Sequence, residues 1–242
     1  MGTKERRQRQ FAEREQLFLD AARRLIEENG LLPLQMTRIA EAAEYAVGTL
    51  YQHFASKEDL LLALTTEGVR EHGALFARVR DWDAAPRDRI MALAVADMVF
   101  VRRNPQYFRI AQYVFCEAVW GSTSAARREA LMEANAPLSE IVVGIIEEAV
   151  ARGDLDIGDM APTELSTGLW AMALGTHDLV HAEGLLADFD VHEPYPLMCQ
   201  HFQALLNGYG WEPRVSTLDK AALRALIARI KTEVFHDLCD HH

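Results

Sequence analysis

Apolar residues recur along almost the whole chain at the 3.6-residue spacing of an α-helix, whereas the alternation typical of a half-buried β-strand is almost absent. Phe18, Ala21 and Ile26 follow this spacing near the N-terminus, and Ile230 and Val234 repeat it near the C-terminus. Each such segment has one apolar side that must be covered by another helix. The sequence therefore predicts an all-α fold.

Glycine and proline residues mark the ends of the expected helices. Asn29-Gly30 ends the first helix, two short helices follow at about 37–43 and 47–54, and a long helix begins at Ser56. The later helices are expected at about 87–103, at 107–115, from the loop at 121–124 to Gly153, from Pro162 onwards, at 197–208 and at 217–238. We expect a small three-helix domain at 1–64 and a larger helical bundle at 65–242.

The composition excludes several classes of protein. Half of the 242 residues are apolar, which favours a packed core over disorder. The longest apolar runs fall far short of the roughly 20 residues that span a bilayer, and the N-terminus lacks the apolar segment of a signal peptide. Cys116, Cys199 and Cys239 lie far apart, so neither a disulfide framework nor a zinc finger is indicated. We expect a soluble, cytoplasmic protein with no membrane partner and no cofactor.

The net charge of −11 disfavours contact with DNA phosphates if it is spread evenly over the surface. Residues 1–64 contain 9 Lys or Arg and 10 Asp or Glu, whereas the remaining residues contain 16 and 26. The first 14 residues contain five basic and two acidic side chains. The acidity therefore belongs to the C-terminal part. The N-terminus is a basic arm that is either a solvated tail or a segment lying along DNA phosphates.

The segment 47–57 reads Val-Gly-Thr-Leu-Tyr-Gln-His-Phe-Ala-Ser-Lys and has two different faces. Leu50 and Phe54, four residues apart, require a core. The polar residues on the other face are Thr49, Tyr51, Gln52 and His53. Ser56 followed three residues later by Asp59 is a capping signature that opens the next helix. A short polar-faced helix between two apolar helices is typical of a helix-turn-helix, although a small surface helix of any α-protein has the same pattern.

Three motifs lie at fixed offsets around this segment: Ile-Ala-Glu-Ala-Ala at 39–43, Gly-Thr-Leu-Tyr-Gln-His-Phe at 48–54, and Ser-Lys-Glu-Asp-Leu-Leu at 56–61. Together they resemble the tetracycline-repressor (TetR-type) family of bacterial transcriptional regulators. The resemblance is close over about residues 14–64 and is one of architecture elsewhere. It implies an N-terminal three-helix helix-turn-helix domain, followed by a helical bundle that binds an effector and forms a homodimer.

The resemblance also implies which residues contact DNA. Val47, Gly48 and Thr49 match the start of the recognition helix, and Tyr51 and His53 match residues that bind phosphate oxygens. Lys57 matches a lysine at the start of the next helix, where a cation and free backbone N–H groups meet one phosphate. Gln52 is expected at a base edge or at the backbone. The full set of expected DNA-contacting residues is Thr37, Arg38, Val47, Gly48, Thr49, Tyr51, Gln52, His53 and Lys57.

Three positions depart from the family's pattern. Gln35 replaces a threonine and is a poorer helix cap, and Ala46 replaces the serine that caps the recognition helix. Glu44 replaces the glycine of the turn, although a glutamate adopts a positive φ less readily. It also brings a negative charge close to the phosphates. These residues alter turns and caps rather than the reading face.

In the bundle, the resemblance implies an effector pocket and a dimer interface. Apolar candidates for lining the pocket are Met91, Met98, Tyr107, Phe108, Met132 and Trp170, with Arg102 or His177 as the polar group. The same residues at helical spacing are also what an ordinary core contains. The helices from Pro162 and at 197–208 resemble the pair that packs against a second copy. The helix at 217–238 extends beyond the family's usual end, and it either wraps the dimer or covers the pocket.

Two other classes of function stay open. His177 and His181 have the spacing of two metal ligands on one helix face, with Asp178 as a possible third ligand. No glutamate follows the first histidine, so no general base is positioned, and we assign no metal and no catalytic residue. A helical adaptor that has lost DNA binding is the other alternative. We predict a homodimeric repressor, not an enzyme, that binds an operator in double-stranded DNA and is released by a small, mostly apolar effector.

Overall fold

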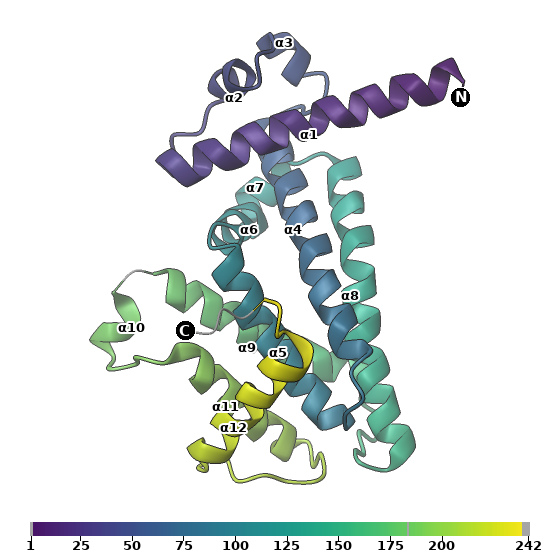
Figure 1. Cartoon of the computed structure of the whole chain (residues 1–242), viewed down its shortest axis with the longest axis vertical. Coiled ribbons are helices and arrows are strands. Elements are labelled where there is room, and N and C mark those ends of the chain that lie inside the picture. The colour runs from purple at the N-terminus through teal and green to yellow at the C-terminus, as the bar shows by residue number, and fades with distance from the viewer. Residues whose placement is uncertain (1, 183, 239–242) are drawn as a thin grey trace. The chain divides into compact units, whose positions relative to one another are not determined.

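The computed structural model describes residues 2–182 and 184–238, and every regular element in these residues is a helix (Figure 1). The helices are α1 (Thr3–Asn29), α2 (Met36–Ala42), α3 (Val47–Leu50), α4 (Lys57–Arg80), α5 (Pro86–Arg103), α6 (Tyr107–Phe115), α7 (Glu117–Ser122), α8 (Ala125–Arg152), α9 (Pro162–His181), α10 (Leu185–Asp188), α11 (Pro194–Gly208) and α12 (Lys220–Val234). The predicted all-α fold is therefore confirmed.

The chain packs into two compact units. The first contains residues up to 69 together with 109–134, and the second contains 70–108 and the residues from 135 onwards. This division by packing differs from the division by function that we expected after residue 64. The first unit includes α7 and the first turns of α8, which the sequence alone assigned to the bundle. The functional boundary at residue 64 stays a prediction.

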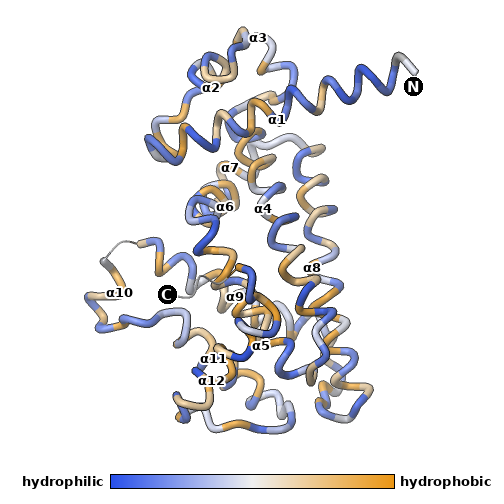
Figure 2. Tube along the Cα trace, in the orientation of Figure 1, coloured by the Kyte–Doolittle hydropathy of each residue, from blue (hydrophilic) through white to orange (hydrophobic). Residues whose placement is uncertain are grey.

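α1 is longer than the sequence pattern indicated. Its apolar residues Phe18, Ala21 and Ile26 are at most 1% exposed and fasten the helix to the first unit. Gly30, with a φ of 81°, ends it as predicted. The N-terminal turns of α1 are exposed and largely hydrophilic (Figure 2). The basic arm is therefore the free end of this helix rather than a separate tail.

α5 is the buried centre of the second unit. The run Ile90–Ala96 is buried at every position, and a helix that is apolar all round has to be covered on all sides. α11 and α12 both pack against it. Pro86 begins the helix at a position where a missing N–H costs no hydrogen bond.

The C-terminal helix α12 is fastened over the start of α5 and the end of α4. The Arg78 guanidinium donates two hydrogen bonds to the Asp237 carboxylate, at 2.6 and 2.8 Å. Arg229 donates to Asp88 at 2.5 Å and lies over the Trp82 ring, 5.3 Å from its centroid. The extra helix thus covers the core of its own second unit, and a role in wrapping a dimer or covering a pocket stays a prediction.

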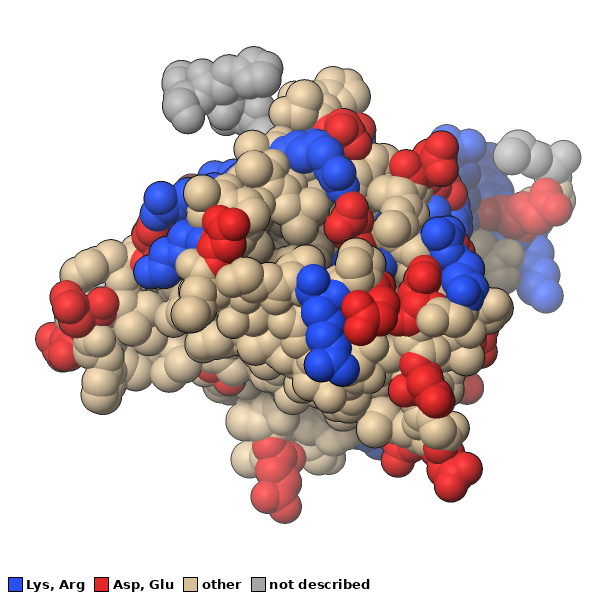
Figure 3. Space-filling model, turned by 90° about the horizontal axis from the view of Figure 1, so that it is seen from below, with Lys and Arg blue, Asp and Glu red and all other residues tan. Residues whose placement is uncertain are grey.

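Two properties of the surface bear on possible partners. No described helix is long and apolar enough to cross a membrane. Acidic and basic side chains lie side by side over the face drawn in Figure 3. Among the described residues, that face therefore offers DNA phosphates no uniformly positive surface.

Candidate nucleic-acid interface

α2 and α3 are joined by a turn that depends on one residue with left-handed backbone. α2 buries Met36, Ile39 and Ala40, and its first residue follows Gln35, whose side chain forms no capping hydrogen bond. Glu44 has a φ of 62°, which allows the Tyr45 N–H to donate to the Ala40 carbonyl at 2.9 Å. The glutamate predicted to fit this turn poorly therefore adopts the conformation that a glycine would adopt without steric cost.

We expect Glu44→Gly to raise the free energy of unfolding by about 0.5–1 kcal/mol, because relief of the left-handed strain exceeds the added chain entropy of glycine. Urea denaturation of the full chain measures this change. Glu44→Gln is the matched control, since it removes the charge and keeps the strain. Equal stability of the glycine and glutamine variants would mean that residue 44 is not strained in the turn.

α3 is shorter than the predicted helix at 47–54. It ends at Leu50, whose carbonyl accepts hydrogen bonds from the N–H groups of His53 and Phe54, at 2.9 and 3.0 Å. Leu50 and Phe54 are fully buried, as expected. We call residues 51–54, which follow the single turn of α3, the bend. Leu50 and Phe54 are the two apolar anchors that hold α3 and the bend to the first unit.

Most of the expected DNA-contacting residues share the exposed surface of α2, α3 and the bend. Tyr51 is 52% exposed, and Thr49 is half-buried. The others exposed on this surface are Thr37, Arg38, Val47, Gly48 and Gln52. Their contacts with DNA stay predictions, but their side chains are free to meet a ligand that approaches α3 from outside.

His53 is a correction to the expected set. Its ring is stacked on Phe11 with 3.8 Å between centroids and meets Phe18 edge-on at 5.4 Å. His53 is 8% exposed, and burial lowers the pKa of its imidazole, although Glu15 at 3.5 Å opposes this shift. An enclosed imidazole cannot bind a phosphate oxygen. His53 therefore holds α1 against the bend.

Lys57 lies at the first position of α4, as expected. Its Nζ atom is 3.4 Å from the carbonyl oxygens of both Leu31 and Leu32, and 6.0 Å from the centroid of the Tyr113 ring. The ammonium group is thus already engaged in the first unit. Its predicted phosphate contact would compete with these weak interactions.

The start of α4 follows the predicted capping signature. The Asp59 N–H donates to Ser56 Oγ at 3.1 Å, which confirms the cap. The buried Asp59 carboxylate accepts a hydrogen bond from the Ser124 N–H, at 2.7 Å, beside the first turn of α8. This contact was not predicted, because nothing local in the sequence relates residues 59 and 124.

A second candidate site lies inside the second unit, where polar groups are buried among aromatic rings. His177 is 2% exposed and stacks on Phe108 with 3.8 Å between centroids. His72 Nε2 lies 2.7 Å from Asp97 Oδ1, and the His72 ring stacks on Phe100. The Tyr195 hydroxyl is 3.5 Å from His177 Nδ1. We call His72, Asp97, Tyr107, His177 and Tyr195 the buried polar cluster, in which Asp97 and His177 are buried and the other three are half-buried.

Burial shifts the protonation of several groups in this cluster. It lowers the pKa of His177 to about 4 and raises that of Tyr195 to about 12. The pKa of Tyr107 is also raised by burial. At neutral pH, His177 is therefore uncharged and both phenols keep their protons. His177 Nε2 has no hydrogen-bond partner among the described residues.

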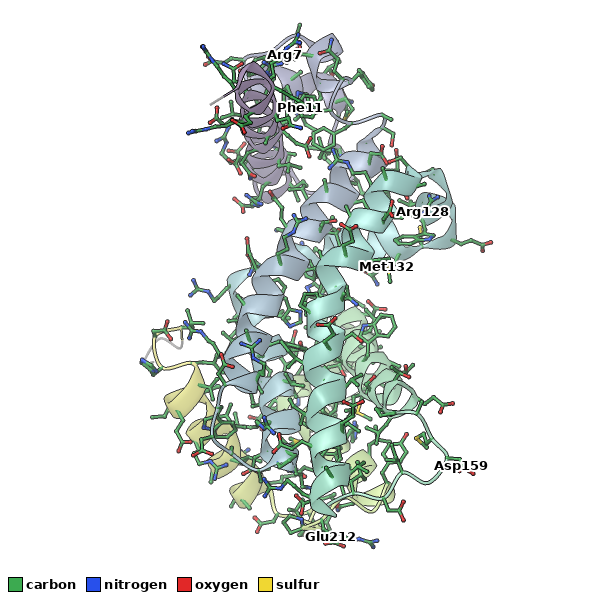
Figure 4. All side chains as sticks on the ribbon, turned by 90° about the vertical axis from the view of Figure 1, so that its right-hand side faces the viewer. Arg7, Phe11, Arg128, Met132, Asp159 and Glu212 are labelled. Atoms are coloured by element: carbon green, nitrogen blue, oxygen red, sulfur yellow. The ribbon has the colours of Figure 1, made fainter. Side chains whose placement is uncertain are left out.

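The cluster includes some of the predicted effector-pocket residues and excludes others. Tyr107 and His177 belong to it, and Phe108 stacks on His177. Met98 is buried next to Cys199, with 3.9 Å between the sulfur atoms. Trp170 is 65% exposed on α9, so its assignment to a pocket lining is wrong. Arg102 is exposed as well, so of the two polar groups considered, Arg102 and His177, only His177 lies inside the cluster. Met132 is exposed and lies on the first turns of α8 (Figure 4).

The side chains of His177 and His181, considered as metal ligands, contact different groups. His181 Nδ1 lies 2.7 Å from the His177 carbonyl oxygen, within the same helix, while the His177 ring faces the core. The described residues contain no group of three His, Cys, Asp or Glu side chains placed to hold a metal ion.

The N-terminal geometry defines the class of protein. A short exposed helix follows a supporting helix and a tight turn, which is the arrangement of a helix-turn-helix. Residues 10–64 match the family model described as "Bacterial regulatory proteins, tetR family". A curated relative, the fatty acid metabolism regulator protein of Bacillus subtilis (strain 168), is 45% identical over 50 residues. That match covers 21% of this chain and spans about a quarter (26%) of the relative.

Solved structures extend the likeness beyond the helix-turn-helix. A transcriptional regulator of the TetR/AcrR family from Thermobifida fusca YX-ER1 is 25% identical, with a TM-score of 0.61, over 81% of this chain and 98% of that one. The transcriptional regulator FadR from Bacillus subtilis in complex with stearoyl-CoA has the same fold, with 18% identity and a TM-score of 0.61, over 80% and 98% of the two chains. Residues 10–64 thus match the TetR family, and the chain as a whole has the fold of the TetR/AcrR-family regulator from Thermobifida fusca.

Proposed function

We propose that the chain is a sequence-specific, DNA-binding transcriptional regulator, and that it acts as a homodimeric repressor released from its operator by a small molecule. The observation that carries the proposal is the exposed polar surface of α2 and α3, held rigidly by the buried side chains of Leu50 and Phe54. A helix fixed at its base and open on its outer side is suited to entering a major groove.

The exposed side of α9 supports the proposal of a homodimer. Trp170 exposes 65% of its surface on this helix, and a large aromatic side chain left exposed favours a protein partner. A second copy of the chain, related by a two-fold axis, would present the same face and cover Trp170. Two recognition helices would then reach half-sites separated by about 34–36 Å, one turn of DNA, or a multiple of it.

Arg38 gives the most direct test of DNA contact, because it is exposed on α2 and charged. We expect Arg38→Gln to weaken binding to all duplexes and to reduce the slope of log affinity against log salt by about 1 for each protomer. Fluorescence anisotropy over a range of salt concentrations measures both quantities. Arg24→Gln is the control, since it removes an equally exposed charge from α1. Equal slopes for the two variants would contradict the placement of α2 on DNA.

The buried polar cluster supports a neutral effector. Asp97 is an acid inside the cluster, and burial keeps His177 uncharged. Arg102 is exposed, although its charge acts on the nearby Tyr195. An anionic group brought close to Asp97 would be repelled and desolvated without a buried cation to compensate for it. A planar, mostly apolar molecule with one hydroxyl group would stack like Phe108 and would bond to His177 Nε2. We therefore propose a neutral phenol-like effector rather than an acyl-CoA.

The choice of effector class is testable by release of DNA. We expect a panel of neutral one- and two-ring phenols to lower operator affinity, and stearoyl-CoA to have no effect. The curated relative's name does not transfer, because the match to it lies within about 50 residues of the chain. His177→Leu should abolish the response to phenols while leaving DNA affinity unchanged. Release by stearoyl-CoA and by no phenol would overturn this choice.

A further inference from the structure

The bend that follows α3 is held from behind by a residue of α8. The Arg127 guanidinium donates to the His53 carbonyl at 3.0 Å and to Glu15 Oε1 at 2.8 Å. It also lies over the Phe54 ring, 4.8 Å from its centroid. Arg127 is half-buried, and all of these atoms belong to the first unit. One side chain thus contacts α1, the bend and an apolar anchor of α3.

Glu15 completes this group. Its second carboxylate oxygen lies 3.5 Å from His53 Nδ1, and the His53 ring is clamped between Phe11 and Phe18 of α1. Figure 4 labels Phe11 on α1 and, on the first turns of α8, Arg128, which follows Arg127 in the chain. The Asp59–Ser124 hydrogen bond joins α4 to the residue just before α8.

We propose that Arg127 is a positioning residue for DNA reading. It fixes the bend at 51–54, so that α3 presents its outer face in one orientation. The proposal rests on the proposed function, because it concerns the same surface. It adds that the reading surface is completed by a residue outside the 1–64 segment to which sequence reasoning assigned DNA binding.

The need for such a residue follows from the length of α3. A helix of four residues has almost no stability of its own, because nucleation fixes several dihedral angles for one hydrogen bond. Leu50 and Phe54 anchor one side, but two apolar contacts leave rotation about their axis unrestrained. A charged donor on the His53 carbonyl removes that freedom, since hydrogen bonds are directional and those to charged groups are the stronger ones.

The experiment compares Arg127→Ala and Arg127→Lys with the wild type in the full chain. The DNA probe is the tightest-binding duplex recovered from fragmented genomic DNA, with a scrambled duplex alongside. We expect Arg127→Ala to lower affinity for the selected duplex at least tenfold and to lower affinity for the scrambled duplex much less. The salt slope should not change, because Arg127 bonds to protein groups and not to phosphates.

Arg23→Ala is the matched control. Arg23 forms a comparable half-buried ion pair in the first unit, with Glu67 at 2.6 Å, and the contacts found for it do not include the bend. We expect Arg23→Ala to shift the thermal midpoint by about as much as Arg127→Ala and to keep selective DNA binding. Arg127→Lys keeps the charge but loses the two separate N–H donors of the guanidinium. Its affinity for the selected duplex should lie between those of the wild type and Arg127→Ala.

Amide hydrogen exchange at residues 53 and 54 tests the positioning role without DNA. Protection there should be lost in Arg127→Ala and kept in Arg23→Ala. The proposal is overturned by unchanged protection, by equal losses of DNA affinity in the two alanine variants, or by a salt slope reduced by about one charge for each protomer, which would indicate a direct phosphate contact. A wild type without selective DNA binding would instead refute the proposed function, and the exchange experiment would still decide the role of Arg127.

Discussion

Replacing Gly48 with alanine is expected to lower operator affinity more than 100-fold while leaving the protein as stable as before, or slightly more stable. Gly48 lies within α3, where glycine costs about 1 kcal/mol relative to alanine. Its φ is not in the left-handed region, and a Cβ added there would meet no described atom within 4 Å. The fold of the free protein therefore does not require this glycine.

A glycine that its own fold does not need is explained by the close approach of a partner to the backbone. A methyl group between α3 and DNA would lower the binding free energy by about 1.5–2 kcal/mol for each half-site. This cost is within the range for one mismatched base pair in a binding site. A dimer incurs this cost twice, and about 3–4 kcal/mol corresponds to a factor of more than 100.

Anisotropy titrations and urea denaturation of the same preparations measure the two effects of Gly48→Ala. Gly144→Ala is the control, because Gly144 is an exposed helical glycine of α8 with equally open surroundings. Both variants should be at least as stable as the wild type, and Gly144→Ala should bind DNA normally. Normal DNA binding by Gly48→Ala would show that α3 does not approach DNA closely.

The second large effect is expected from Arg87→Met, which should lower the free energy of unfolding by about 3–5 kcal/mol, because several buried acceptors lose a charged donor at a cost of about 1–3 kcal/mol each. Arg87 is buried, and desolvation lowers the pKa of its guanidinium. It donates to the Trp211 carbonyl at 2.6 Å, to Gln203 Oε1 at 2.7 Å and to Asn207 Oδ1 at 2.8 Å. Methionine fills similar space but leaves these acceptors without their donor.

For a chain of this length, such a loss corresponds to a fall in Tm of roughly 6–20 °C, which thermal denaturation monitored by circular dichroism detects. Arg229→Met is the matched control, since Arg229 forms an exposed ion pair with Asp88 at 2.5 Å and should contribute less than about 1 kcal/mol. Similar shifts for both variants would mean that the buried bonds of Arg87 do not link the start of α5 to α11.

The sequence predicted helices well where the signal was local. The spacing of Phe18 and Ile26, the stop at Gly30 and the cap at Ser56 are each set by residues within a few positions of one another. The end of α3 was misjudged, because the same apolar pair, Leu50 and Phe54, fits either a continued helix or a bend. Periodicity alone cannot separate the two.

The errors at the sites have a different origin. His53 was expected to bind phosphate because it is polar and matches a phosphate-binding position of the family, but Phe11, 42 positions earlier, covers its ring. Trp170 matched the spacing of a core residue, yet which side of α9 faces inward depends on the helices packed around it. Arg127 gave no signal, since its partners Glu15 and His53 are distant in the chain.

The central claim is that the exposed face of α3 reads a DNA sequence, and selection from fragmented genomic DNA tests it most directly. The purified chain is mixed with the fragments at about physiological salt, because affinity without a stated salt concentration cannot be interpreted. Bound fragments are sequenced, and the most enriched duplex is titrated against a scrambled one. The account predicts an enriched, roughly palindromic motif that binds two chains and resists the scrambled competitor. Recovery of fragments without enrichment over the input, or equal competition by the scrambled duplex, would contradict it.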